Sequence, residues 1–332
     1  MFCAAPGVPA ARLDAADGKI AWSLPGRGSS DTVSGDAGPV LSGGLLYVTG
    51  TGGQRLQALD PATGRQRWSA SLEGFPTVRH AAGTAVLVSA DGRTVRALDG
   101  RTGAPRWTRR LDARSTVWTD PSGTGQALYA VAPTQDGTGS TVSALDPATG
   151  RARWSTTVAG TLSPVHESGP TLWALSQRPD GLTDSVVRIG GAAGASTRRV
   201  PLPNPVDQAQ ATVSGGIAYV MSYAGALSAL DTREGAARPV LWTLETAVTR
   251  ASRPTADGAG HVFVTAGDGR LLAVDAARGT LLAQTAPRLG AQRSTVAASL
   301  PAPVLTAGGR EVVAAGPDGS VLAGDARHPS DW

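Results

Sequence analysis

The stretch Ala58-Leu59-Asp60-Pro61-Ala62-Thr63-Gly64-Arg65-Gln66-Arg67-Trp68 decides the fold, because the chain repeats it. The pattern Ala-Leu-Asp-x-x-Thr-Gly-x-x-x-Trp is intact again at Ala97 to Trp107 and at Ala144 to Trp154. Four weaker copies keep part of the pattern, and the last has Pro329 in place of glycine. The repeat-motif residues are Asp14, Gly18, Trp22, Asp60, Gly64, Trp68, Asp99, Gly103, Trp107, Asp146, Gly150, Trp154, Asp231, Gly235, Asp275, Gly279 and Asp325. A signature that recurs in this way is typical of a repeat protein.

The spacing of the motif aspartates gives the length of the repeat. Successive motif aspartates lie 46, 39, 47, 85, 44 and 50 residues apart. The interval of 85 residues spans two repeats, and a degenerate copy falls inside it at Val187-Arg188-Ile189-Gly190 with Gly194. The sequence therefore contains eight motif positions.

Each repeat also contains a short aliphatic run upstream of the motif, such as Leu45-Leu46-Tyr47-Val48 or Ile217-Ala218-Tyr219-Val220. Runs of this composition bounded by glycine favour buried strands. Hairpin turns such as Asp91-Gly92 separate the aliphatic run from the motif that follows it. Within the motif, we expect the aspartate to accept hydrogen bonds from the next backbone amides and the glycine to adopt a left-handed conformation. The tryptophan then lies on an outer strand and packs against the neighbouring repeat.

Four-stranded antiparallel units of roughly 40–45 residues predict an all-β fold, a β-propeller. A sandwich or a single closed barrel explains the repeated signature less well, and no amphipathic helix supports an α/β enzyme. We predict one domain over residues 1–332, with eight blades favoured and seven as the alternative. The predicted units are a partial first blade at 1–24 and repeats at about 36–72, 76–112, 115–158, 161–202, 207–246, 250–286 and 300–332.

The first repeat is expected to be incomplete. Only thirteen residues, Met1 to Leu13, precede its motif aspartate, too few for the two inner strands of a blade, so only seven aliphatic second strands are found. Either the C-terminal segment lends strands to this blade, or the chain is a fragment of a longer protein. We favour the fragment, because the last blade needs its own strands.

The composition narrows the class of partner. The chain has 43 glycines and 23 prolines, only 17% of its residues are charged, and its net charge is +4. Arginine pairs such as Arg109-Arg110 and Arg198-Arg199 fit solvated loops, and no basic stripe with interleaved aromatics predicts nucleic-acid binding. Cys3 is the only cysteine, so no internal disulfide is possible. No apolar span reaches the ~18 residues of a transmembrane helix, and no secretory signal is present.

The repeat resembles the PQQ-like (pyrroloquinoline quinone) repeat, including the tryptophan-docking motif of quinoprotein dehydrogenases and their non-enzymatic relatives. The resemblance spans almost the whole chain and implies a propeller, commonly of eight blades. It also implies the possibility of a dehydrogenase in which an aspartate acts as base beside PQQ and Ca²⁺. This sequence has no pair of adjacent cysteines, is short for a catalytic member, and shows no oxygen-rich cluster outside the repeat turns. We therefore predict no cofactor, no metal site and no catalytic residue.

Other catalytic patterns are equally absent from the sequence. The histidines at 80, 166, 261 and 328 stand singly without metal-ligand spacing, and no Gly-x-Ser-x-Gly elbow marks a nucleophile. Trp118, expected on an inner strand, and Trp173, expected on a second strand, could stack on a ligand, but packing between blades explains them better.

The sequence thus predicts a non-catalytic propeller that binds a protein, peptide or small molecule at its face or funnel. Two contexts resemble it: the sensor or scaffold part of a bacterial Ser/Thr kinase or envelope protein, which we favour, and a scaffold for outer-membrane protein assembly like BamB. A quinoprotein dehydrogenase is the remaining alternative. Either binding context implies an extracytoplasmic or membrane-associated location in the cell envelope, with a cytoplasmic location left open. The oligomeric state is left open too.

Overall fold

The structure is a computed structural model that describes residues 1–5, 8–14, 17–25, 38–50, 54–120, 125–190, 196–288, 300–306 and 308–332. Apart from one short 3₁₀ helix, η1 (Pro329–Asp331), the regular elements in these ranges are β-strands. The strands form eight antiparallel sheets of neighbouring strands, numbered here as blades 1 to 8 in chain order. The chain divides into two compact units, which are described separately.

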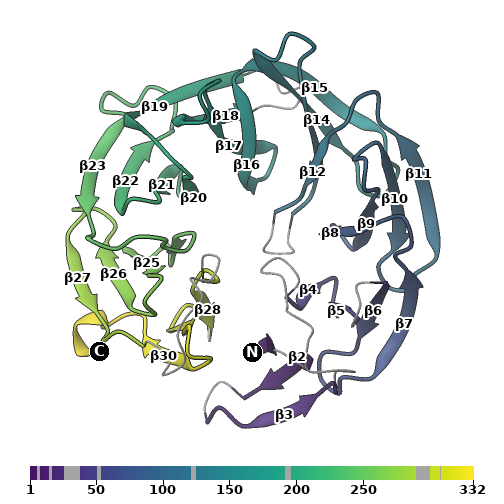
Figure 1. The fold of residues 1–332 in the computed structure, drawn as a ribbon, viewed down its shortest axis with the longest axis horizontal. Coiled ribbons are helices and arrows are strands. Elements are labelled where there is room, and N and C mark those ends of the chain that lie inside the picture. Colours follow the sequence, from purple (N-terminus) through teal and green to yellow (C-terminus); the bar gives the residue numbers. More distant parts are fainter. Residues whose placement is uncertain are drawn as a thin grey trace. The chain divides into compact units, whose positions relative to one another are not determined.

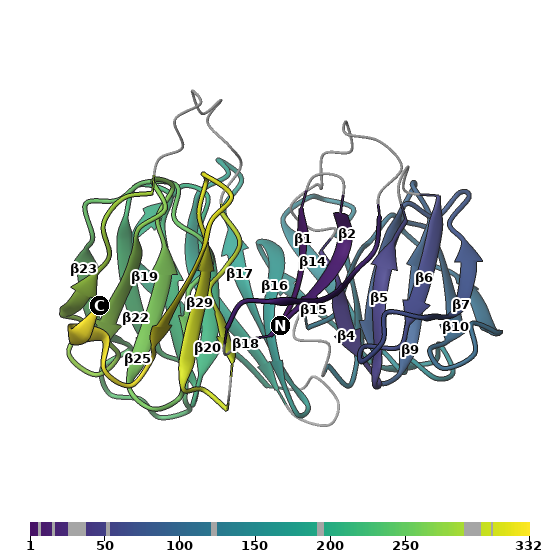
Figure 2. The same cartoon turned by 90° about the horizontal axis from the view of Figure 1, so that it is seen from below.

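Unit 1 comprises Met1–Ala159 and Glu167–Thr171 and contains blades 1 to 4. In the view of Figure 2, the strands of blade 2 stand roughly upright beside one another. The strands are β1 (Phe2–Ala5), β2 (Val8–Leu13) and β3 (Ile20–Ser23) in blade 1; β4 (Val40–Ser42), β5 (Leu45–Thr49), β6 (Arg55–Leu59) and β7 (Gln66–Ser71) in blade 2; β8 (Thr77–Ala81), β9 (Thr84–Val88), β10 (Thr94–Asp99) and β11 (Pro105–Arg110) in blade 3; and β12 (Thr116–Trp118), β13 (Leu128–Pro133), β14 (Gly139–Leu145) and β15 (Ala152–Ala159) in blade 4.

Unit 2 comprises Gly160–His166, Leu172–Gly190 and Ser196–Trp332, and contains most of blade 5 with blades 6 to 8. Figure 1 shows the order of the strands within each sheet. The strands are β16 (Thr161–Ser168), β17 (Thr171–Gln177), β18 (Thr183–Gly190) and β19 (Ser196–Val206) in blade 5; β20 (Gln210–Ser214), β21 (Ile217–Met221), β22 (Ala226–Asp231) and β23 (Val240–Glu245) in blade 6; β24 (Thr255–Ala256), β25 (His261–Thr265), β26 (Leu271–Asp275) and β27 (Leu281–Gln284) in blade 7; and β28 (Val304–Thr306), β29 (Glu311–Ala315) and β30 (Val321–Asp325) in blade 8.

The repeated meander confirms the predicted fold class, an all-β propeller of eight four-stranded blades with two blades incomplete in the described residues. In every complete blade the aliphatic run is the second strand. In all of them except blade 5, whose copy is degenerate, the motif connects the third strand to the fourth. The third and fourth strands share one irregularity, a β-bulge immediately after the residue opposite the tryptophan, as at Ala58/Leu59 and Ala97/Leu98. The bulge increases the local twist where the corner begins.

The first blade corrects one expectation. Residues 1–13 were expected to be too few for the two inner strands of the blade, but β1 (Phe2–Ala5) pairs with β2 and takes the second position. The ring of Phe2 lies 6.0 Å from that of Trp22, as aromatic second-strand residues do in other blades. The run was missed because Phe-Cys-Ala-Ala has little aliphatic character. Blade 1 therefore lacks only a first strand in the described residues.

Apolar side chains pack between consecutive sheets within each unit. Tyr47 and Leu56 of blade 2 meet Ala85 and Leu87 of blade 3, for example, and all four are less than 5% exposed. Because each sheet is narrow, both of its faces must be covered by neighbours, which explains why β9 (Thr84–Val88) is buried at all five positions.

One titratable side chain lies inside this packing. His80, on β8, is only 6% exposed, and its ring centre lies 4.2 Å from that of Tyr47. Its Nδ1 atom has no hydrogen-bond partner among the described residues. Burial, with a smaller contribution from the Arg79 charge, lowers the pKa of His80 to about 4. The imidazole is therefore neutral in the folded protein at neutral pH.

We predict that His80 makes unit 1 sensitive to acid between about pH 6.5 and pH 4. The pKa rises from about 4 in the folded chain to 6.5 in the unfolded chain, so the stabilisation is fully present above pH 6.5 and is lost as the pH falls towards 4. The loss should be on the order of 3 kcal/mol. Melting temperatures at pH 7.5 and 4.5 measure it: His80→Leu should lose less stability over this interval than the native chain, whereas the control His328→Leu, at an exposed position, should behave as native. Equal pH dependence for all three would contradict the prediction.

Candidate functional site

The motif aspartates are held by their own turns. Oδ1 of Asp60 accepts hydrogen bonds from the backbone N–H groups of Ala62 (3.0 Å) and Thr63 (3.1 Å), and Gly64 N–H donates to the Asp60 carbonyl (2.8 Å). The same two side-chain bonds recur at Asp99, Asp146 and Asp275 with lengths of 2.8–3.0 Å. The carboxylate therefore forms an Asx turn at each of these corners.

An arginine that the sequence analysis did not single out completes the corner in three blades. Arg67, Arg106 and Arg153 each precede the motif tryptophan, and each donates from Nη2 to the second carboxylate oxygen of the motif aspartate at 2.6–2.8 Å. The Arg106 guanidinium beside Asp99 lowers the pKa of that carboxyl to about 2. The recurrence of Arg-Trp in the three intact copies was the available signal.

The motif tryptophans lie on the fourth strands and reach the corner of the next blade. In four blades the indole N–H donates to the carbonyl of the residue that follows the next motif aspartate. The pairs are Trp22 with Pro61 (3.2 Å), Trp68 with Gly100 (2.8 Å), Trp107 with Pro147 (2.9 Å) and Trp242 with Ala276 (3.0 Å). Each bond joins two blades of one unit.

The motif glycine accommodates the same indole. Gly64, Gly103 and Gly150 have φ of +70° to +74°, and a Cβ atom at each would lie 2.7–2.8 Å from a ring atom of the tryptophan of the preceding blade. Gly279 is covered in the same way by Trp242. Glycine thus meets two requirements at once, a left-handed backbone and room for the ring.

The weaker copies of the motif form different contacts from those of the intact copies, as their sequences imply. Gly235 has φ +75°, but a Cβ atom there would meet nothing within 4 Å, and blade 5 carries no tryptophan on its fourth strand. At Asp231 the partner is Arg233, through both its backbone and its side chain. Asp14 and Gly18 close a corner through Gly18 N–H to Asp14 O (3.0 Å), while Asp325 accepts from Arg327 N–H (2.8 Å). Of the degenerate copy, Val187–Gly190 ends β18, and Gly194 lies outside the described residues.

A second set of links between blades comes from aromatic residues on second strands. Tyr47 Oη donates to the Gly100 carbonyl (2.8 Å), the same acceptor that Trp68 uses. Trp173 Nε1 donates to Thr232 Oγ1 (2.8 Å) and is 6% exposed, so this ring packs rather than lining an opening. Trp118 is on the first strand of blade 4, with its ring 5.9 Å from Tyr129.

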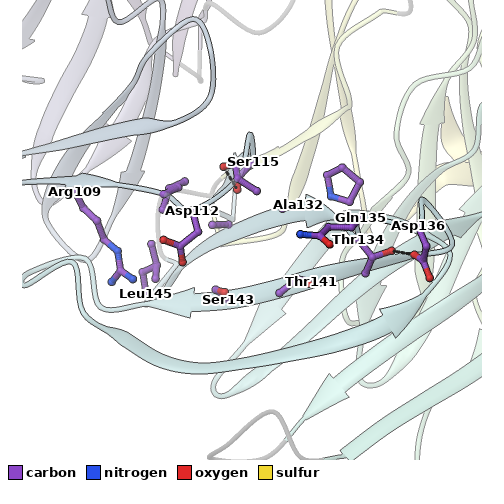
Figure 3. A pocket seen from close by; sticks show the side chains of 14 residues that line it. Arg109, Asp112, Ser115, Ala132, Thr134, Gln135, Asp136, Thr141, Ser143 and Leu145 are labelled. Atoms are coloured by element: carbon purple, nitrogen blue, oxygen red, sulfur yellow. Dashed lines mark hydrogen bonds between the residues drawn. The ribbon is translucent and has the colours of Figure 1, made fainter.

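The described surface of unit 1 contains a groove of about 600 Å³ between blades 3 and 4. Figure 3 shows Arg109, Asp112 and Leu145 towards one end and Thr134, Gln135 and Asp136 towards the other. It lies beside the connections from β11 to β12 and from β13 to β14. Its volume is in the range of ligand-binding clefts.

Two of the residues that line the groove, Ala130 and Ser143, are smaller than their equivalents in blade 7. The pairing registers align Ala130 and Ser143 of blade 4 with Val264 and Leu272 of blade 7. Val264 and Leu272 are at most 1% exposed and belong to the packed core between blades 6 and 7. In blade 4 the corresponding space is left open.

The groove combines fixed polar groups with apolar lining residues such as Leu111 and Leu145. Arg109 Nη1 donates to the Gly150 carbonyl (2.7 Å), which holds the guanidinium at one end. At the other end Thr134 Oγ1 donates to Asp136 Oδ1 (2.6 Å), and this bond is the largest cause that lowers the pKa of Asp136. Ser143, on the wall, forms a hydrogen bond with Ser155 (3.0 Å). These groups suit hydrogen bonding to a polar or peptide ligand.

Elsewhere in the described parts of the chain, the titratable groups do not form a metal-binding cluster. Among the described residues, no three His, Cys, Asp or Glu side chains lie close enough to hold a metal ion. The four histidines are separate: His261 pairs with Asp257 (2.7 Å), and His328 with Asp325 (3.3 Å), for example. None of the described residues forms a helix long and apolar enough to cross a membrane.

The corner, the docked tryptophan and the succession of sheets together define a PQQ-like repeat β-propeller. The family described as outer membrane protein assembly factor BamB matches residues 8–167 and 160–328. The chain therefore belongs to this family. No curated protein matches it significantly.

Several solved structures share the fold at low sequence identity. BamB from Moraxella catarrhalis is 18% identical with a TM-score of 0.64, over 97% of this chain and 90% of that one. AztD from Citrobacter koseri is 12% identical with a TM-score of 0.67, over 99% and 92% of the two chains. Quinohemoprotein alcohol dehydrogenase from Comamonas testosteroni is 17% identical with a TM-score of 0.60, over 95% and 69%. At these identities the likeness concerns the fold alone.

We predict that Gly103→Ala is more damaging than Gly235→Ala. The two glycines have nearly the same φ, +74° and +75°, so both variants carry left-handed strain of ~1–2 kcal/mol. Only at Gly103 would the new methyl group also meet the Trp68 ring, at 2.7 Å, which adds ~1–3 kcal/mol of overpacking. Thermal unfolding of the two variants beside the native chain measures the difference. Equal losses of melting temperature would show that the indole does not depend on the motif glycine.

Proposed function

We propose that the chain is a non-catalytic propeller that binds a protein or peptide segment in the bacterial cell envelope, as a scaffold or as the sensor part of a larger protein. The observation that carries this proposal is the groove between blades 3 and 4. It is a place in unit 1 where the packing of the repeat is incomplete, and its polar groups are already fixed by neighbours. Preformed polar groups reduce the entropy cost of binding.

The motif carboxylates form their hydrogen bonds within their own corners, and this supports a non-catalytic role. A quinone or Ca²⁺ site needs several oxygen ligands that converge on one point. Asp60, Asp99 and Asp146 each accept two backbone N–H groups and an arginine in their own blade instead. The donor set described here therefore does not fit that cofactor.

Family membership supports an envelope location and a protein partner. Its printed description is an outer membrane protein assembly factor, so a role in outer-membrane protein assembly is the second candidate. The kinase-linked sensor role rests on the sequence pattern. Both candidates use the propeller as a rigid platform whose connections carry recognition.

We predict that filling the groove abolishes partner binding without harming the fold. The double variant Ala130→Val with Ser143→Leu copies the residues that blade 7 uses at the equivalent positions, so it should pack at little cost. Affinity capture from an envelope fraction, quantified by mass spectrometry, should show partners of the native chain falling at least about tenfold with this variant, a change of 1.4 kcal/mol. The control Thr243→Leu, on the exposed face of β23, adds similar apolar surface elsewhere. If the native chain, the double variant and the Thr243→Leu control captured the same proteins in equal amounts, the groove would not be the binding site.

The enzyme alternative has its own test. Titration of the purified chain with PQQ and Ca²⁺, followed by an assay of alcohol or sugar oxidation with an artificial electron acceptor, should give neither saturable cofactor binding nor turnover. The motif carboxylates are not arranged to coordinate the metal, because their oxygens accept hydrogen bonds within their own turns. Saturable binding accompanied by turnover would replace the proposal with a quinoprotein dehydrogenase.

A further inference from the structure

Blade 7 lacks its own docking tryptophan. In blades 2, 3, 4 and 6 the register places a tryptophan on the fourth strand opposite an alanine on the third: Ala58 with Trp68, Ala97 with Trp107, Ala144 with Trp154 and Ala229 with Trp242. In blade 7 the equivalent pair is Ala273 with Ala283. The space that an indole fills elsewhere is thus left open by the blade itself.

Trp332 fills that space from outside the blade. Its ring lies 5.9 Å from Phe263, the second-strand aromatic residue of blade 7. The motif tryptophans lie at nearly the same distance from their own second-strand tyrosines: 5.9 Å for Tyr47–Trp68, and 6.0 Å for Tyr129–Trp154 and Tyr219–Trp242. Trp332 Nε1 donates to the Asp325 carbonyl of blade 8 (3.0 Å), one residue before the carbonyl used in the other corners.

The segment that carries Trp332 makes few contacts. Along Arg327–Trp332 only Pro329 is buried and Trp332 is partly buried, whereas the other four residues are exposed. Its internal hydrogen bonds close the η1 turn, Trp332 N–H to the Pro329 carbonyl (3.2 Å) among them. The ion pairs of Arg327 and His328 with Asp325 lie on the surface and contribute little. No β-ladder ties the segment to blade 8, since β30 is the last strand of its sheet in the described residues.

We propose that the space between blades 7 and 8 is a binding site for an indole supplied by a separate segment, and that Arg327–Trp332 is an exchangeable occupant of it. The partner is a peptide segment with a Pro-x-x-Trp turn, because proline and tryptophan are the two residues of the present occupant that are not exposed. We call this space the indole slot. It lies in unit 2, whereas the groove belongs to unit 1, and the proposal does not depend on the groove.

The experiment uses the full chain with Trp332→Ala, and a matched variant that fills the slot from within the blade, Trp332→Ala with Ala283→Trp. The probe is an acetylated peptide with the sequence of residues 326–332, beside the same peptide with alanine for tryptophan. Trp332→Ala should lower the melting temperature by on the order of 2–6 °C. The added Ala283→Trp should restore most of that loss, because the register puts residue 283 at the tryptophan position. Ala283→Phe is the smaller substitute if the double variant folds poorly.

Calorimetric titration then decides whether the slot binds an external segment. The tryptophan peptide should bind Trp332→Ala at least about tenfold more tightly than the native chain or the filled variant, and the alanine peptide should not bind. A native melting temperature for Trp332→Ala, or equal peptide binding by all three chains, would overturn the proposal. So would a destabilised Trp332→Ala chain that binds no peptide. A concentration-dependent dimer of the native chain that Trp332→Ala abolishes would support exchange, with a second copy of this chain as the source of the indole.

Discussion

The contact of an indole with a glycine corner on the next sheet joins blades 1 to 4 of unit 1 and blades 6 and 7 of unit 2. It combines three physical requirements in one place: a large ring that buries apolar surface, an N–H group that must find an acceptor, and a backbone that leaves room for both. Trp68 on Gly103, with its N–H on the Gly100 carbonyl, satisfies all three. The aspartate turn matters because it points the carbonyl and the glycine towards the approaching ring.

The corner is rigid because its charges are satisfied locally. Asp99 binds two amides and Arg106, so its carboxylate stays ionised and in place. An exposed ion pair of this kind adds little to global stability, but a carboxylate with several donors fixes the geometry of the turn. Because the corner is repeated, the same local arrangement joins neighbouring blades at several places along the chain, as in other repeat architectures.

The sequence predicted the parts of the fold that depend on local chemistry. Asp60, Gly64 and Trp68 could be assigned to a corner and an outer strand because turn preference, backbone freedom and ring size are properties of the residues themselves. β1 escaped prediction because Phe-Cys-Ala-Ala becomes a strand only through its pairing with β2. The Tyr47 hydroxyl bond escaped too, since its acceptor is 53 residues away. The groove could not be predicted, because it results from what Ala130 and Ser143 fail to fill, and that becomes visible only when their register is compared with that of another blade.

The places where the repeat departs from its own pattern are therefore the places to look for function. A residue that matches the pattern is explained by packing, and its substitution is expected to change stability first. Ala130 and Ser143 are smaller than Val264 and Leu272 at the equivalent positions of blade 7, and Ala283 lies where four other blades carry a tryptophan. In one case the space remains an open groove, and in the other Trp332 occupies it. Since the same fold could fill these spaces with larger side chains of its own, substitution at these positions tests ligand binding without changing the residues of the repeat motif.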